Sequence, residues 1–140
     1  MRTIALSFVL LAVCASAAPA PDTPFSALAK LSTDLSENDA TGAMAFFDSS
    51  MKGYGDLQRN VESLAEQTTI LSALDVIEDK DNSGVHTLSV DWYITLTLMS
   101  DPTYTERRRE QVTVEMREVG GKWKITSMST VSILDPIKIQ

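Results

Sequence analysis

The sequence predicts an α+β domain in which N-terminal helices pack on one face of a curved antiparallel sheet. Two observations lead to this fold class. Apolar residues recur at helical spacing in the first half of the chain, and from Thr68 onward they alternate with polar residues among frequent β-branched side chains. Helices followed by a run of strands favour a layer of helices on one sheet face.

The first 17 residues have the build of a secretory signal peptide. Arg2 gives a positive start, the apolar run 4–13 is too short to cross a bilayer, and Ala15-Ser16-Ala17 fits the small-x-small cleavage pattern. We therefore expect a signal peptide over 1–17, cleavage after Ala17 and a secreted or periplasmic domain without a stable membrane span.

Cys14 leaves a minor alternative open. A bacterial lipoprotein keeps a cysteine at its cleavage point and is anchored through lipid attached to it. Val13 stands where a small residue is usual, so loss of Cys14 with the signal peptide is the favoured interpretation.

The mature chain is expected to be acidic and free of cysteine. The full sequence has a net charge of −7 and one cysteine, and cleavage after Ala17 removes Arg2 and Cys14. Nucleic acid and anionic membrane surfaces repel such a chain, so neither is an expected partner. Without disulfides, stability must come from apolar burial.

The N-terminal half predicts a short lead-in and then helices. Residues 18–23 contain two prolines and are expected to be extended, ahead of a single domain over 24–140. Thr23 is a suitable N-cap, with Pro24 at the first helical position. From there an apolar stripe runs to about Asp48, in a helix that is bent or interrupted at 36–39.

A further helix is expected next, with Asp56 as its cap and an end near Gln67. Four strands should follow, at 68–78, 85–99, 106–119 and 122 to about 133.

The strand at 85–99 alternates so regularly that its two faces can be assigned. Trp92 belongs to the apolar, inward set, whereas Asp91 and Tyr93 point to the opposite face. Gly120-Gly121 predicts a tight hairpin. A change of face along the last strand predicts a bulge near Thr126-Ser127.

These features resemble the nuclear transport factor 2-like superfamily, which includes ketosteroid isomerase-like and polyketide cyclase-like proteins. The resemblance rests on the split helix around Ser36-Glu37-Asn38-Asp39-Ala40, the strand with Asp91-Trp92-Tyr93 and the hairpin Gly120-Gly121-Lys122-Trp123-Lys124-Ile125. It implies a cystatin-like cone with a pocket at its open end, and members often form dimers through the sheet. It implies no reaction, because this fold carries many functions.

Five residues are candidates for ligand binding. Arg108 shares the inward parity of its strand and would orient an acidic ligand, unless it pairs with a neighbouring glutamate. Tyr54 is the second, and Phe47, Trp92 and Met116 are the others, although core packing is the favoured interpretation for each of these three taken singly. A cavity among them would favour a flat apolar molecule.

Between Leu88 and Leu98, the inward face of the strand at 85–99 offers no acid, base or nucleophile. We therefore predict a non-catalytic domain that binds a small apolar or weakly acidic molecule in the cone or forms a homodimer through the sheet. The alternative is a ketosteroid isomerase-like or cyclase-like enzyme. It would need Asp48, Tyr54, Asp91 or Tyr93 inside the cavity.

No cofactor or metal is expected. His86 is the single histidine, so a transition-metal site lacks ligands. Residues 79–84 match the first half of a calcium loop, but Val90 stands where a bidentate glutamate is needed. A polar hairpin turn accounts for the same residues.

Overall fold

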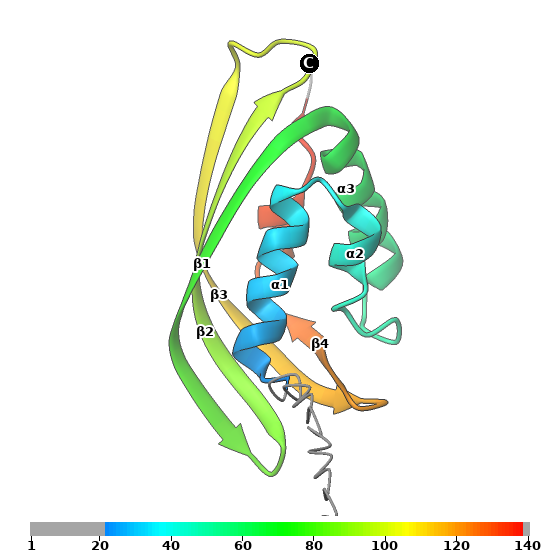
Figure 1. The fold of residues 1–140 in the computed structure, drawn as a ribbon, viewed down its shortest axis with the longest axis vertical. Coiled ribbons are helices and arrows are strands. Elements are labelled where there is room, and N and C mark those ends of the chain that lie inside the picture. Colours follow the sequence, from blue (N-terminus) through cyan, green and yellow to red (C-terminus); the bar gives the residue numbers. More distant parts are fainter. Residues whose placement is uncertain (1–21, 139–140) are drawn as a thin grey trace, which may run out of the picture.

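The computed structural model describes residues 22–138, which form a layer of helices within a curved four-stranded sheet (Figure 1). The described elements are α1 (Pro24–Ser36), α2 (Ala40–Met44), α3 (Tyr54–Gln67), β1 (Thr68–Asn82), β2 (Val85–Leu98), β3 (Thr105–Val119), β4 (Lys122–Met128) and a 3₁₀ turn, η1 (Val131–Leu134). The predicted α+β class is confirmed. The predicted signal peptide, its cleavage site and residues 18–21 of the lead-in lie outside the described residues.

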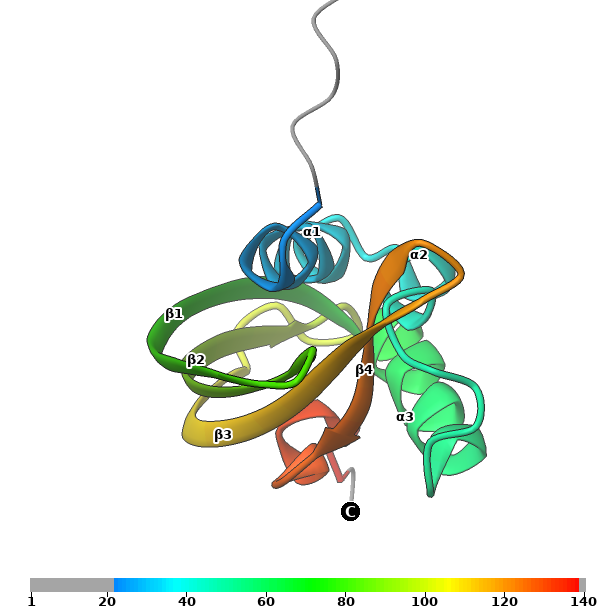
Figure 2. The same ribbon diagram turned by 90° about the horizontal axis from the view of Figure 1, so that it is seen from below.

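The sheet is an antiparallel meander in the order β1-β2-β3-β4. Its strands bend around α1, which lies within the curve beside β1, and Figure 2 shows α3 on the other side of β4. This arrangement leaves one sheet face against the helices and the other face outward.

The start of α1 follows the prediction. The Thr23 hydroxyl accepts a hydrogen bond from the Ser26 amide and the Ser26 hydroxyl accepts one from the Thr23 amide, a reciprocal capping box. Pro24 is the first helical residue.

The expected cap of α3 is wrong, although its predicted end at Gln67 is confirmed. Gly53 occupies the N-cap position with a φ of 79°, a left-handed conformation that glycine adopts without penalty. Asp56 lies instead in the first turn, where the helix dipole favours a carboxylate.

The predicted interruption at 36–39 is confirmed and has a structural purpose. Asn38 has a φ of 56°, and its side-chain amide donates to the carbonyls of Ala65 and Thr68 while its oxygen accepts from the Ile70 amide. Asn38 therefore ties the end of α1 to the junction between α3 and β1.

Helix beyond Met44 was expected as far as Asp48, and this is wrong. The Ile125 amide donates to the Phe46 carbonyl at 2.8 Å, and the Asp48 amide donates to the Ile125 carbonyl at 2.8 Å. Pairing with β4 requires an extended backbone, so the chain leaves the helix after α2.

The inward face of β2 forms the centre of the core, as predicted. Its buried members are Leu88, Val90, Trp92, Ile94, Leu96 and Leu98. Val112, Val114 and Met116 of β3 are buried beside them. Asp91 and Tyr93 lie on the opposite face, as predicted.

Two strand ends differ from expectation by more than one residue. β1 continues to Asn82 because its hairpin needs only Ser83 and Gly84, whose φ values of 55° and 90° suit a two-residue turn. β4 ends at Met128 rather than near Ile133, since the chain turns at Thr130 into η1.

The predicted bulge in β4 is confirmed. Glu115 pairs with Ser127 and Met116 pairs with Ile125, so Thr126 is the extra residue. The bulge explains how Ile125 and Met128 can both face the core.

We predict that Asn38→Ala lowers the free energy of unfolding by about 2–3 kcal/mol, because three backbone groups lose their partner and alanine is strained at positive φ. Asn38→Gly should be less destabilising than Asn38→Ala, because glycine relieves the backbone strain but does not restore the lost hydrogen bonds. Urea denaturation measures both, with Lys52→Ala on an exposed loop as control. A change within 0.5 kcal/mol for Asn38→Ala would contradict this role.

Candidate functional site

The interior of the cone is filled by side chains. Phe47, Trp92 and Met116, three of the predicted ligand-binding residues, are 2%, 0% and 0% exposed and belong to one continuous core. The C-terminal segment contributes the buried side chains Ile133, Leu134 and Ile137. A ligand in contact with the three predicted residues would therefore have to displace core side chains.

The polar atom of Trp92 is also occupied. Its indole N–H donates to the Ser72 hydroxyl at 2.9 Å, and the Ser72 hydroxyl is 2.8 Å from that of Ser32 on α1. A buried indole usually needs such a partner. Trp92 thus links three elements of the fold: β2, β1 and α1.

Arg108 points inward, as its parity predicts, and holds the C-terminal segment. Its guanidinium donates to the carbonyl of Ile133 at 3.0 Å, to that of Asp135 and to the Glu106 carboxylate at 2.8 Å. The side chain is only 16% exposed. Charge-assisted hydrogen bonds of this kind are strong, so Arg108 anchors the residues that close this end of the cone.

The enzyme alternative depends on four residues, and three of them are poorly placed for catalysis in the cone. Asp48 is hydrogen-bonded to the main chain, and Asp91 and Tyr93 lie outside the interior. Asp48 accepts a hydrogen bond from the Ser50 amide at 3.0 Å, which helps to lower the pKa of its carboxyl. Asp91 and Tyr93 lie on the outer sheet face. Tyr54 begins α3 and packs half-buried against the edge of the core.

The surroundings of Asp91 oppose a role as general base. Arg109 donates two hydrogen bonds to its carboxylate, at 2.9 and 3.2 Å, and these lower the pKa of Asp91. A general base that works near neutral pH needs the opposite shift. The Arg109 guanidinium also lies 4.5 Å from the centre of the Tyr93 ring.

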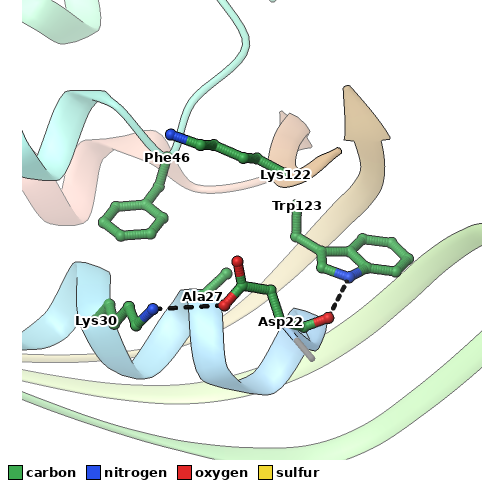
Figure 3. Close-up of a pocket in the computed structure, with 6 residues that line it drawn as sticks. All are labelled: Asp22, Ala27, Lys30, Phe46, Lys122 and Trp123. Atoms are coloured by element: carbon green, nitrogen blue, oxygen red, sulfur yellow. Dashed lines mark hydrogen bonds and ion pairs between the residues drawn. The ribbon is translucent and has the colours of Figure 1, made fainter. Parts of the chain in front are cut away.

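A small pocket opens between α1 and the start of β4 (Figure 3). Its volume is about 180 Å³, and its lining residues are Asp22, Ala27, Lys30, Phe46, Lys122 and Trp123. The Trp123 indole N–H donates to the Asp22 carbonyl at 2.9 Å, which ties the residues just before α1 to the start of β4 at this wall.

The pocket combines aromatic surface with positive charge. Phe46 and Trp123 are half-buried, and Figure 3 shows the Lys30 ammonium turned toward Asp22 and the Lys122 side chain extending toward Phe46. Lys30 is 3.4 Å from the Asp22 carboxylate. Two ammonium groups and one carboxylate leave a net positive site in a chain whose overall charge is −7.

The sequence analysis placed Lys122 and Trp123 in the hairpin motif but assigned neither of them a binding role, and it did not single out Lys30 or Phe46. Lys30 and Lys122 come from α1 and β4, which are distant in the chain. A weak signal exists, because Ala27 and Lys30 share one side of α1 and Lys122 directly follows Gly120-Gly121. Nothing in either segment alone indicates that they meet.

His86 lies where β2 leaves the hairpin and links the two hairpin tips. Its Nδ1 is 2.8 Å from the Asp79 carboxylate, and its ring meets that of Trp123 edge-on, with 4.9 Å between centroids. Across residues 22–138, no group of three or more histidine, cysteine, aspartate or glutamate side chains is arranged to hold a metal ion.

Comparison with solved structures places the chain in a known fold. A conserved protein from Planctomyces limnophilus matches with a TM-score of 0.68 at 10% identity, over 74% of this chain and 88% of its own. A ketosteroid isomerase-like protein from Erwinia carotovora atroseptica matches at 0.61 and 15% identity, over the same shares. A protein of unknown function with a cystatin-like fold from Nostoc punctiforme matches at 0.51 and 18%, over 74% of this chain and 84% of its own.

The chain therefore has the cone fold of nuclear transport factor 2-like proteins, as the sequence predicted. Identities this low show the fold alone. No family model and no curated protein matches the sequence. Among the helices of the described residues, none has the length and apolar character to cross a membrane.

We predict that Arg108→Gln speeds hydrogen exchange at the amides of Asp135 and Ile137 by at least tenfold, because the C-terminal segment loses charge-assisted hydrogen bonds. Arg107→Gln, one position away on the exposed face, is the matched control. Equal exchange in the two variants would show that Arg108 does not hold the segment.

Proposed function

We propose that this protein is an exported, non-catalytic domain that binds a small, weakly acidic aromatic molecule in the pocket between α1 and β4. One observation carries the proposal: Lys30 and Lys122 lie at the same pocket as the rings of Phe46 and Trp123. Ammonium groups suit a carboxylate, and the rings suit a flat apolar body. Export rests on the signal-peptide pattern of residues 1–17.

The size of the pocket limits the ligand. About 180 Å³ is below the roughly 300–1,000 Å³ of pockets that take drug-sized molecules, so a single ring with one acidic group is the fitting class. For about ten non-hydrogen atoms we expect a Kd on the order of 1 mM.

The enzyme alternative has less support. It needs an ionisable side chain held in an apolar cavity with a pKa matched to its task. Asp91 is paired with Arg109 on the outer face, and the pocket between α1 and β4 includes none of Asp48, Tyr54, Asp91 and Tyr93.

The binding proposal is tested with benzoate and its neutral analogue benzamide. We expect benzoate to bind more tightly than benzamide, and Lys30→Gln and Lys122→Gln each to weaken benzoate about fivefold, because each removes one positive charge. Isothermal titration calorimetry measures the affinities, with Lys52→Gln as a control of equal charge change on an exposed loop. Equal affinity for benzoate and benzamide, or an equal effect of Lys52→Gln, would overturn the proposal.

A second candidate function is pairing of two copies through the outer face of the sheet. Leu71 and Tyr93 are 68% and 38% exposed there, on neighbouring strands, and Arg109 stacks on the Tyr93 ring. Exposed aromatic and arginine side chains near the centre of a contact face are typical of residues that dominate interfaces.

If two copies pair through this face, sedimentation velocity should show a dimer for the wild-type protein. The double variant Leu71→Asp/Tyr93→Asp should be a monomer, because desolvating two carboxylates at an interface is costly. Val119→Asp, also at an exposed apolar residue but near a hairpin tip, should leave the dimer intact. A wild-type monomer at about 100 μM would exclude this candidate as a stable state.

A further inference from the structure

A groove runs along α1 on the side opposite the ligand pocket. It lies between α1 and β1, has a volume of about 470 Å³, and is lined on the helix by Phe25, Ala29, Ser32 and Ser36. At 100° per residue these positions share one side of the helix, whereas Ala27 and Lys30 of the ligand pocket lie on the other. The two hollows are therefore separate sites.

The other wall of the groove is the free edge of the sheet. β1 pairs with β2 on one side only, so alternate backbone groups of β1 point away from the sheet. At Ile70 and Ser72, in the first part of this edge, side chains at the end of α1 form hydrogen bonds with these backbone groups. Asn38 accepts from the Ile70 amide at 3.2 Å, and Ser36 accepts from the Ser72 amide at 2.9 Å and donates to the Ser72 carbonyl at 3.3 Å.

The same edge continues without such caps. By the two-residue period of a strand, the backbone groups of Leu74 and Val76 point the same way as those of Ser72. Among the residues that the structure describes, no side chain takes the place at Leu74 and Val76 that Ser36 takes at Ser72. Within residues 22–138, the edge of β1 in and just beyond the groove therefore presents unpaired backbone donors and acceptors.

Side chains give this edge an apolar inner side. Leu74 and Val76 face inward and pack against the core, and Phe25 remains 57% exposed at the start of α1. Ala29 lines the groove on α1, and its small side chain leaves space between the helix and β1. An edge strand beside such a groove is the surface to which extended peptides add as a further strand, with alternate side chains in the groove.

The acidic side chains around the groove favour a basic extended segment over an acidic one. Glu37 lines one end of the groove, Asp75 lies on the outward side of β1, and Glu78 and Asp79 follow it. Lys80 offsets one of them, at 3.5 Å from Glu78. A second copy of β1 would place carboxylates opposite carboxylates, whereas lysines or arginines would meet opposite charges.

We propose that the groove between α1 and β1 binds an extended basic peptide segment by strand addition. The peptide backbone pairs with Leu74 and Val76, its apolar side chains enter the groove beside Phe25 and Ala29, and its basic side chains lie outward beside Asp75. This is an interaction site distinct from the small-molecule pocket.

The probe is a labelled peptide, acetyl-Lys-Val-Lys-Val-Lys-Val-Lys-amide, in which valines share one side and lysines the other. Fluorescence anisotropy should show a Kd of about 10–100 μM, and an acidic twin with glutamate for lysine should bind at least tenfold more weakly. In the protein, Ala29→Arg should weaken the basic peptide at least tenfold by filling the groove, while Ala45→Arg on an exposed surface is the control. Thermal melting verifies that both variants fold.

Backbone pairing is tested with two N-methylated peptides, one methylated at the valines and one at the lysines. In a strand, alternate N–H groups point to opposite edges, so one methylated set should abolish binding and the other should retain it. Equal loss or equal retention in the two sets would overturn strand addition. Equal binding of the acidic twin, or unchanged binding in Ala29→Arg, would overturn the site.

Discussion

The position of α1 against the start of β1 is the constraint on which the rest of the structure depends. Asn38 and Ser36 bind the backbone of β1, and Ser72 in turn accepts the Trp92 indole N–H at the centre of the core. These hydrogen bonds hold α1 within the curve of the sheet. Its two sides then face different partners: β4 across the small pocket, and the free edge of β1 across the groove.

The same packing leaves the interior of the cone filled by side chains. The space in which a cone would hold a substrate is filled by Trp92, Met116 and the C-terminal segment, which Arg108 holds by its backbone carbonyls. Polar side chains in this region are engaged with one another or with the main chain. Hollows remain at the rim, where side chains from distant segments meet without completing a core, and the proposed binding sites lie there.

Much of the fold could be predicted because it depends on local patterns. Strict alternation in β2 assigns Trp92 inward and Asp91 outward, and Thr23-Pro24 marks the start of α1. What failed depends on distant partners: the helix stops after Met44 because the following residues pair with β4. The pocket likewise depends on distant partners, because Lys30 and Lys122 line it from α1 and β4. Neither segment alone indicates that the two lysines lie at one pocket.

The two tryptophans provide the most direct test of a filled interior with a ligand pocket at the rim. Trp92 lies in the core and Trp123 lines the pocket, and each has an indole N–H with a separate resonance in a ¹H–¹⁵N spectrum. On titration with benzoate, the Trp123 indole resonance should shift while that of Trp92 stays in place. A shift of the Trp92 resonance with Trp123 unmoved would place the ligand inside the cone and contradict this account.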